Sequence, residues 1–138
     1  MKASNWAIPQ LPGLSSQQSA DLEAQNIHTT LQLIRQGSTQ AKREQLAAQL
    51  RIHIQHVNKW VALADLARIP AVGCRYCGLL LHAGISSSAH LAQTSIHKLY
   101  PQIRRFYATV LHQMQACPPA DEVNQWIQQA RAIAGHSG

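Results

Sequence analysis

Acidic residues are scarce in this chain. Only six Asp and Glu occur in 138 residues, and all charged residues together make up 13% of the sequence, where ~25% is usual. General acid–base catalysis commonly draws on paired carboxylates, and no such pair stands out. The serines of GISSSAHLAQTS also lack an adjacent Asp/His arrangement that would make one a nucleophile. The sequence therefore predicts a protein that is not an enzyme and takes no small-molecule substrate.

Long apolar runs are missing as well. The longest such stretch, GLLLHAGI, is far shorter than the ~20 residues that a membrane-spanning helix needs. The N-terminal MKASNWAIPQLPG lacks the apolar region of a secretory signal. Cysteine occurs three times, an odd number that fits a reducing compartment better than a disulfide framework. We therefore expect a cytoplasmic protein without membrane insertion.

The chain does have an excess of basic residues. Twelve Lys and Arg give a net charge of +6 and a pI near 9.7. This balance favours anionic partners such as nucleic acid, acidic protein surfaces or anionic lipid. The basic residues are dispersed, however, and solubility alone explains the charge equally well. Seventeen scattered glutamines indicate a polar helical surface.

Aligning the chain with itself reveals an internal repeat. Residues 11–33 match residues 69–91 without a gap. Further on, VNKWVALADL resembles VNQWIQQARAI, and Trp60 and Trp126 hold equivalent places, as core anchors. Duplication predicts an architecture more firmly than local propensity does. We predict two tandem repeats, at 1–67 and 68–138, each with a trailing Trp-bearing helix, packed as one compact unit.

The pattern within each repeat is all-α, and no alternation of period two indicates a strand. Asn26 and Gly84 occupy matching places at expected helix ends, because both residue types tolerate the left-handed conformation. Thr29, and Ser86 or Ser87, are expected to cap the short helices that follow.

Later helices are expected from caps and prolines. Ser38 is expected to cap a helix over 39–51. Pro101 fits the first turn of another helix, because its missing N–H is harmless there. Cys117-Pro118-Pro119 is expected to break that helix. Asp121 and Glu122 then suit the positive end of the last helix.

Each repeat opens with a stretch that resembles the helix-hairpin-helix motif. This motif reads hydrophobic–Pro–Gly–hydrophobic–Gly, followed by a helix with a small residue four positions on. The first repeat has LPGLS at 11–15 with Ser19 at the small position, and the second has IPAVG at 69–73 with Cys77 there. The whole unit resembles an uncharacterised bacterial domain family, frequent in photosynthetic bacteria, that carries such hairpins.

The resemblance implies sequence-independent binding of DNA. In helix-hairpin-helix proteins the glycine turn brings backbone N–H groups at a helix N-terminus up to a phosphate, where the helix dipole also favours an anion. Such contacts position a duplex without reading its sequence. The residues implied at this interface are Gly13, Leu14 and Ser15 of the first turn, Arg68, Ala71, Val72, Gly73, Cys74 and Arg75 of the second, and Arg104 and Arg105 as further cations.

Both turns depart from the motif. Ser15 replaces the second glycine of the first turn, and Ala71 replaces the first glycine of the second, where a positive φ would strain it. The first turn also lacks nearby basic residues and is followed by Asp21 on its hairpin helix. We therefore expect the second turn, flanked by Arg68 and Arg75, to dominate.

Cys74 and Cys77 form a C-x-x-C pair, which raises the question of a redox or metal site. Cys77 aligns with the small packing position. Cys74 lies at a helix N-terminus with Arg75 beside it, and an environment of this kind can lower the pKa of a thiol. No βαβ context accompanies the pair, and the spacings to other Cys and His match no zinc motif. His53 and His56 have no nearby carboxylate to complete a site. Packing explains the cysteines better than metal or redox use, and we expect no cofactor and no metal.

Two functions remain open. The leading hypothesis is a non-enzymatic, sequence-independent nucleic-acid (DNA) binding module in which the second repeat dominates. The alternative is a protein-interaction or assembly adaptor that keeps the fold without binding nucleic acid, motivated by the missing glycines and the Gln-rich surface.

Overall fold

The computed structural model describes residues 2–136, and within them the chain is helical without a strand. This confirms the all-α prediction. The α-helices are α1 (Ser16–Ala24), α2 (Thr30–Gln36), α3 (Gln40–Leu50), α4 (Ile54–Ala67), α5 (Gly73–His82), α6 (Ser88–Ala92), α7 (Ile96–Phe106) and α8 (Ala120–His136). Short turns are η1 (Ile8–Gln10), η2 (Tyr107–Leu111) and η3 (Met114–Ala116).

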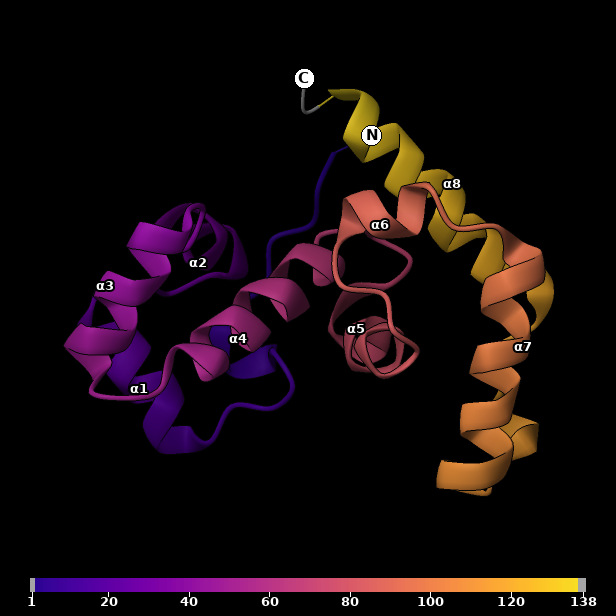
Figure 1. Cartoon of the computed structure of the whole chain (residues 1–138), viewed down its shortest axis with the longest axis horizontal. Helices are drawn as coiled ribbons and strands as arrows, with labels where there is room; N and C mark the ends of the chain where they lie inside the picture. The colour runs from indigo at the N-terminus through magenta and orange to yellow at the C-terminus, as the bar shows by residue number, and fades with distance from the viewer. Residues whose placement is uncertain (1, 137–138) are drawn as a thin grey trace.

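The helices gather into two halves that meet where α4 leads into α5 (Figure 1). In the first half α2 and α3 pack against α4, and in the second half α6 and α7 pack against α8. α4 also packs along α5, so one helical hairpin joins the halves. The two halves thus share one order of helix packing, while their origin by duplication stays a prediction.

The segment before α1 runs between the halves and connects them (Figure 1). The backbone N–H of Ser4 donates to the carbonyl of Arg68 at 2.8 Å. Trp6 accepts from the N–H of Thr30 at 2.8 Å, and Ile8 donates to the carbonyl of His28 at 3.0 Å. The N-terminal segment therefore holds the start of α2 and the end of α4 together.

Several helix ends lie where the sequence predicts them. Asn26 has a φ of 64° and Gly84 a φ of 89°, both in the left-handed region. Thr29 caps α2 and Ser87 caps α6 through their side-chain oxygens. The cap of α3 is Thr39, not Ser38, and its hydroxyl accepts from the N–H of Lys42 at 3.1 Å. The prediction for that cap is wrong by one residue.

The expected place of Pro101 in a first turn is wrong. α7 begins at Ile96, because Ser95 already caps it by accepting from the N–H of Lys98 at 3.3 Å. Pro101 therefore lies inside the helix, on its exposed side, where water can bond to the carbonyl that proline leaves free. The helix ends well before Cys117: a π-helical turn follows Phe106 and closes at His112, whose φ is 52°.

A single cluster of buried side chains runs through both halves. Trp60 of α4 is 2% exposed and Trp126 of α8 is 0% exposed, which confirms both as core anchors. None of the helices in residues 2–136 has the length and apolar character that crossing a bilayer requires.

Candidate nucleic-acid interface

The turn between α4 and α5 has its backbone donors already bonded within the protein. The N–H of Ala71 donates to the side-chain oxygen of Gln129 in α8 at 2.7 Å. The N–H groups of Val72 and Gly73 both donate to the carbonyl of Ile69, at 3.0 and 2.9 Å. A phosphate at this turn would have to displace these bonds, so the amides of residues 71–73 are poor phosphate ligands.

Trp6 covers the same turn. A Cβ built on Gly73, whose φ is 55°, would lie 3.0 Å from the indole ring, and the indole N–H donates to the carbonyl of Ala67 at 2.8 Å. Glycine is thus required at position 73 by both its backbone and its close neighbour. Ala71 does not have a positive φ, so the expected strain at that position is wrong. The residue of this turn with a positive φ is Gly73, at the second glycine position of the motif.

Arg68 is committed to an internal ion pair. Its Nε lies 2.8 Å from a carboxylate oxygen of Asp65, and another guanidinium nitrogen donates to the hydroxyl of Ser88 at 2.8 Å. Asp65 also accepts from the N–H of Ser88 at 2.7 Å. Arg68 therefore ties the end of α4 to the start of α6. By contrast, Arg75 is exposed and lies over the ring of Tyr76, 4.9 Å from its centre.

The first turn is more open than the second. Gly13 is exposed with a φ of 84°, and Leu14 is half-buried. Ser15 caps α1 in a reciprocal pair with Gln18, its hydroxyl accepting at 3.1 Å and its N–H donating at 2.9 Å. Asp21 accepts from Gln17 on the same helix, at 2.8 Å. The nearby carboxylate keeps this helix unfavourable for phosphate.

Sequence reasoning missed two basic side chains beside the first turn. Lys59 of α4 and His82 of α5 line a cavity together with Pro12 and Gly13. They are distant in sequence and meet the turn only through the packing of α4 and α5. No local pattern could have found them.

The cysteines are packing residues in this structure. Burial, and to a lesser degree Cys74, raises the pKa of Cys77 to about 12, and burial raises that of Cys74 above its ordinary 9.0. The expectation that Arg75 would lower the pKa of Cys74 is wrong, because burial raises that pKa instead. Cys77 is fully buried, in agreement with its small packing position.

We predict that Cys77 resists alkylation in the folded protein. With a pKa of about 12, only about one thiol in ten thousand is ionised at pH 8, and the side chain is buried. Iodoacetamide at pH 8, followed by mass spectrometry of the peptides, should modify Cys77 at least about a hundredfold more slowly than in urea-unfolded chain. Equal rates in the two states would contradict this assignment.

His53 and His56, at the start of α4, each interact with a neighbouring group of the protein. His53 caps the helix, its ring nitrogen accepting from the N–H of Gln55 at 3.1 Å. The ring of His56 lies 6.3 Å from that of Trp60. Among the side chains that the structure describes, no three His, Cys, Asp or Glu are placed to share a metal ion.

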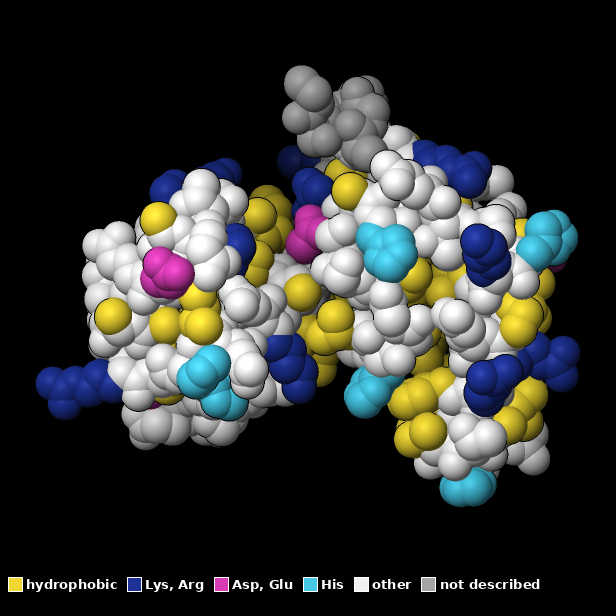
Figure 2. Space-filling view, in the orientation of Figure 1, with side chains coloured by type: hydrophobic (Ala, Val, Ile, Leu, Met, Phe, Trp, Pro, Cys, Tyr) yellow, Lys and Arg dark blue, Asp and Glu magenta, His cyan; other side chains and the backbone are white. Residues whose placement is uncertain are grey.

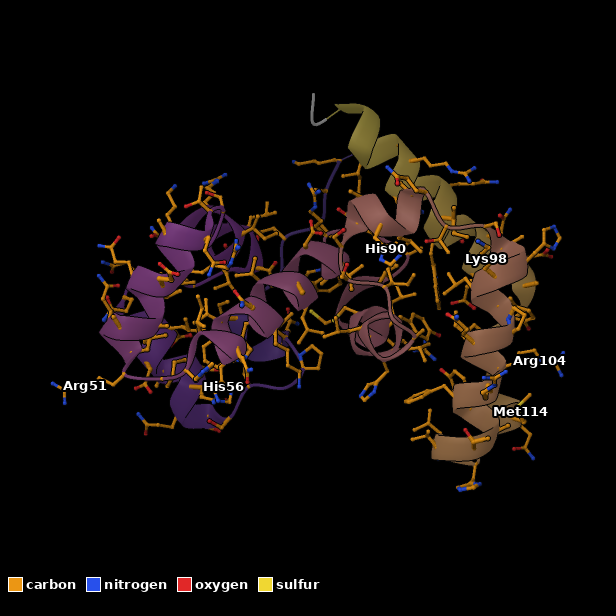
Figure 3. The ribbon with its side chains drawn as sticks, viewed as in Figure 1. Arg51, His56, His90, Lys98, Arg104 and Met114 are labelled. Carbon is orange, nitrogen blue, oxygen red and sulfur yellow. The ribbon has the colours of Figure 1, made fainter. Side chains whose placement is uncertain are left out.

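α7 carries the clearest basic surface. Lys98, Arg104 and Arg105 are all exposed on this helix, and His97 is exposed beside them. Figure 2 shows Lys and Arg side chains along α7, and Figure 3 shows Lys98 and Arg104 on the same helix. The sequence from residue 66 to residue 120 contains no Asp or Glu at all. This absence of acidic residues is evident from the sequence, and it indicates the basic surface of α7 more directly than the two turns do.

The turns that follow the C-terminal end of α7, η2 and η3, expose apolar side chains. Val110 is 60% exposed, Met114 40% and Leu111 39%. Met114 borders a hollow of about 420 Å³ that Arg104 and Arg105 also line, and Figure 3 shows Met114 close to Arg104. Basic and apolar groups therefore share one surface.

Comparison with known proteins gives a family but no characterised relative. Searches of curated proteins and of solved structures found no match to the chain. A family model described as a domain of unknown function (DUF4332) matches residues 12–133, which include both hairpin turns and most of α8. The chain belongs to this uncharacterised domain family (DUF4332).

Proposed function

We propose that this protein is a non-enzymatic, sequence-independent nucleic-acid-binding module whose main contact surface is α7. Lys98, Arg104 and Arg105 provide the phosphate contacts. The observation that carries the proposal is the absence of Asp and Glu from residues 66–120, because α7 then presents its cations without a carboxylate of its own segment to neutralise them.

The spacing of these cations suits a phosphate backbone. Lys98 and Arg105 are seven residues apart, which is about 10 Å along a helix axis. Successive phosphates of one DNA strand advance about 3.4 Å along the duplex, so the cations of α7 span about three phosphates. Side chains of this kind position the nucleic acid without reading bases.

The α4–α5 hairpin supports the proposal at its exposed edge. In it, α4 and α5 pack against each other on either side of the turn. No side chain caps α5, and exposed Arg75 lies in its first turn. Arg75 and the α5 N-terminus would add one contact, in place of the bonded amides of residues 71–73.

The test compares two variants of equal charge. One variant replaces the α7 cations (Lys98→Gln, Arg104→Gln, Arg105→Gln). The control replaces three exposed cations of the first half (Arg35→Gln, Lys42→Gln, Arg51→Gln). Fluorescence anisotropy with a labelled duplex of about 20 base pairs, titrated across salt concentrations, measures the dissociation constant and its salt dependence.

We expect the α7 variant to bind at least about tenfold more weakly at low salt. Its slope of log affinity against log salt should fall by about one for each lost phosphate contact. The control should lose far less affinity, because the cations that it removes lie outside the α7 contact surface. Equal losses in both variants would mean that net charge alone causes binding, and would overturn the α7 assignment. Unchanged binding in both would overturn nucleic-acid binding by these residues.

A second candidate, a protein-interaction adaptor, is favoured by one observation: Val110, Leu111 and Met114 are exposed, and Val110 and Met114 each line a hollow together with Arg105. Exposed apolar side chains that adjoin one another are typical of docking surfaces. Charge complementarity points to a partner whose apolar surface is edged by carboxylates. The combined variant Val110→Ser, Leu111→Ser and Met114→Ser separates the candidates. Its duplex affinity should persist under the nucleic-acid proposal, and its capture of one defined native partner should be lost under the adaptor proposal.

A further inference from the structure

A cavity of about 300 Å³ lies between the turn that precedes α1, the middle of α4 and the outer side of α5. Figure 1 shows that turn passing beneath α4 toward α5. Pro12, Leu63 and Leu81 provide apolar walls, and Lys59 and His82 add the only ionisable groups of its lining. Small-molecule sites have this character: mostly apolar, about 300–1,000 Å³ in volume, with a few polar groups.

Gly78 lines the cavity and leaves that part of its wall without a side chain. It lies inside α5, where glycine is less favourable than alanine because it loses more backbone freedom on folding. Its φ is not positive, and a Cβ added there would meet only Pro12, at 4.0 Å. Neither the backbone nor close packing therefore requires glycine at position 78. Because glycine has no side chain, position 78 leaves the wall of the cavity open.

The basic side chains indicate the sign of a ligand. Lys59 and His82 are both exposed, and no carboxylate lines the cavity. His82 is held in place by its ring, which stacks on Phe106 of α7 with 5.1 Å between ring centres. An anionic head group could bind at Lys59 and His82 while an apolar body contacts the walls. About 300 Å³ leaves room for about ten small groups the size of water.

We propose that this cavity binds a small organic anion with an apolar body, of the aromatic or short aliphatic carboxylate class. The site is independent of the proposed nucleic-acid function, because Lys98, Arg104 and Arg105 do not line it. It also differs from the expectation of no small-molecule substrate, since the ligand is bound and not converted.

The experiment titrates 2-naphthoate into ¹⁵N-labelled full-length protein and follows the backbone amide signals by NMR. We expect saturable shifts centred on Gly13 and Gly78. Gly78→Leu, which fills the cavity, should weaken binding at least about tenfold, while thermal unfolding verifies that the variant is folded. Lys59→Gln should weaken binding by a similar factor, as should replacing 2-naphthoate with uncharged 2-naphthamide.

Lys42→Gln is the matched control, since it removes an exposed first-half cation away from the cavity, and it should bind as wild type. Lys59→Gln changes only an exposed side chain, so it keeps the test decisive even where Gly78→Leu disturbs folding. Shifts that fail to saturate, shifts centred elsewhere, or equal affinity in wild type and Lys59→Gln would overturn the proposal. Duplex binding by the same samples is measured separately, so failure of one proposal is distinguishable from failure of the other.

Discussion

The Trp126→Ala variant is expected to lose about 3–5 kcal/mol of the free energy of unfolding. Trp126 is fully buried in α8, and its ring lies 4.8 Å from that of Tyr76 in α5, tilted by 36°. α8 also packs on α6 and α7, so the indole fills the centre of the second half. Domains are typically stable by only about 5–15 kcal/mol, and this single change should therefore remove a large part of the total. Urea denaturation followed by circular dichroism measures the loss.

Trp126→Phe provides the comparison that isolates packing from polarity. The indole N–H of Trp126 is buried and has no hydrogen-bond partner among the described residues, and such a donor costs about 1–3 kcal/mol. Phenylalanine keeps an aromatic ring against Tyr76 and removes this donor. We therefore expect Trp126→Phe to lose much less stability than Trp126→Ala. A loss below about 1 kcal/mol for Trp126→Ala would contradict the packing of α8 described above.

Local signals predict much of this fold. The caps at Thr29 and Ser87 and the left-handed ends at Asn26 and Gly84 all depend on a residue and its immediate neighbours. Burial of Trp60 and Trp126 follows from size and hydrophobicity. For Pro101, a stronger local signal lies upstream, because the Ser95 cap starts α7 before the proline is reached.

Long-range contacts explain what the sequence could not show about the site. Arg68 looks like a free cation beside a turn, yet it has two partners: Asp65 in the preceding helical turn and Ser88, twenty residues further along the chain. Position 73 requires glycine because Trp6, near the N-terminus of the chain, packs where a side chain would begin. The backbone N–H of Ala71 likewise donates a hydrogen bond to the side chain of Gln129, far along the chain. A phosphate site built on exposed donors cannot be inferred from a motif until these distant partners are known.

The Asp65→Ala variant is expected to lose about 2–4 kcal/mol of the free energy of unfolding. Asp65 accepts three hydrogen bonds: from Arg68 Nε at 2.8 Å, from the N–H of Ser88 at 2.7 Å and from the hydroxyl of Ser88 at 3.0 Å. Its side chain is only 19% exposed and that of Arg68 23%. Removing the carboxylate leaves a half-buried guanidinium and a buried serine without their acceptor, which costs more than the pair itself contributes.

A double-mutant cycle shows whether Arg68 is structural or available to nucleic acid. If Arg68 acts through Asp65 and Ser88, Arg68→Met should cost less than Asp65→Ala, and the two changes should couple by at least about 1 kcal/mol in urea denaturation. Folded Arg68→Met should then bind a duplex as tightly as wild type, since the cations of α7 remain. Additive losses of stability, together with a weakened duplex affinity, would instead return Arg68 to the phosphate interface. The ion pair predicts the first outcome, because a guanidinium that already has two partners gains little by exchanging them for a phosphate.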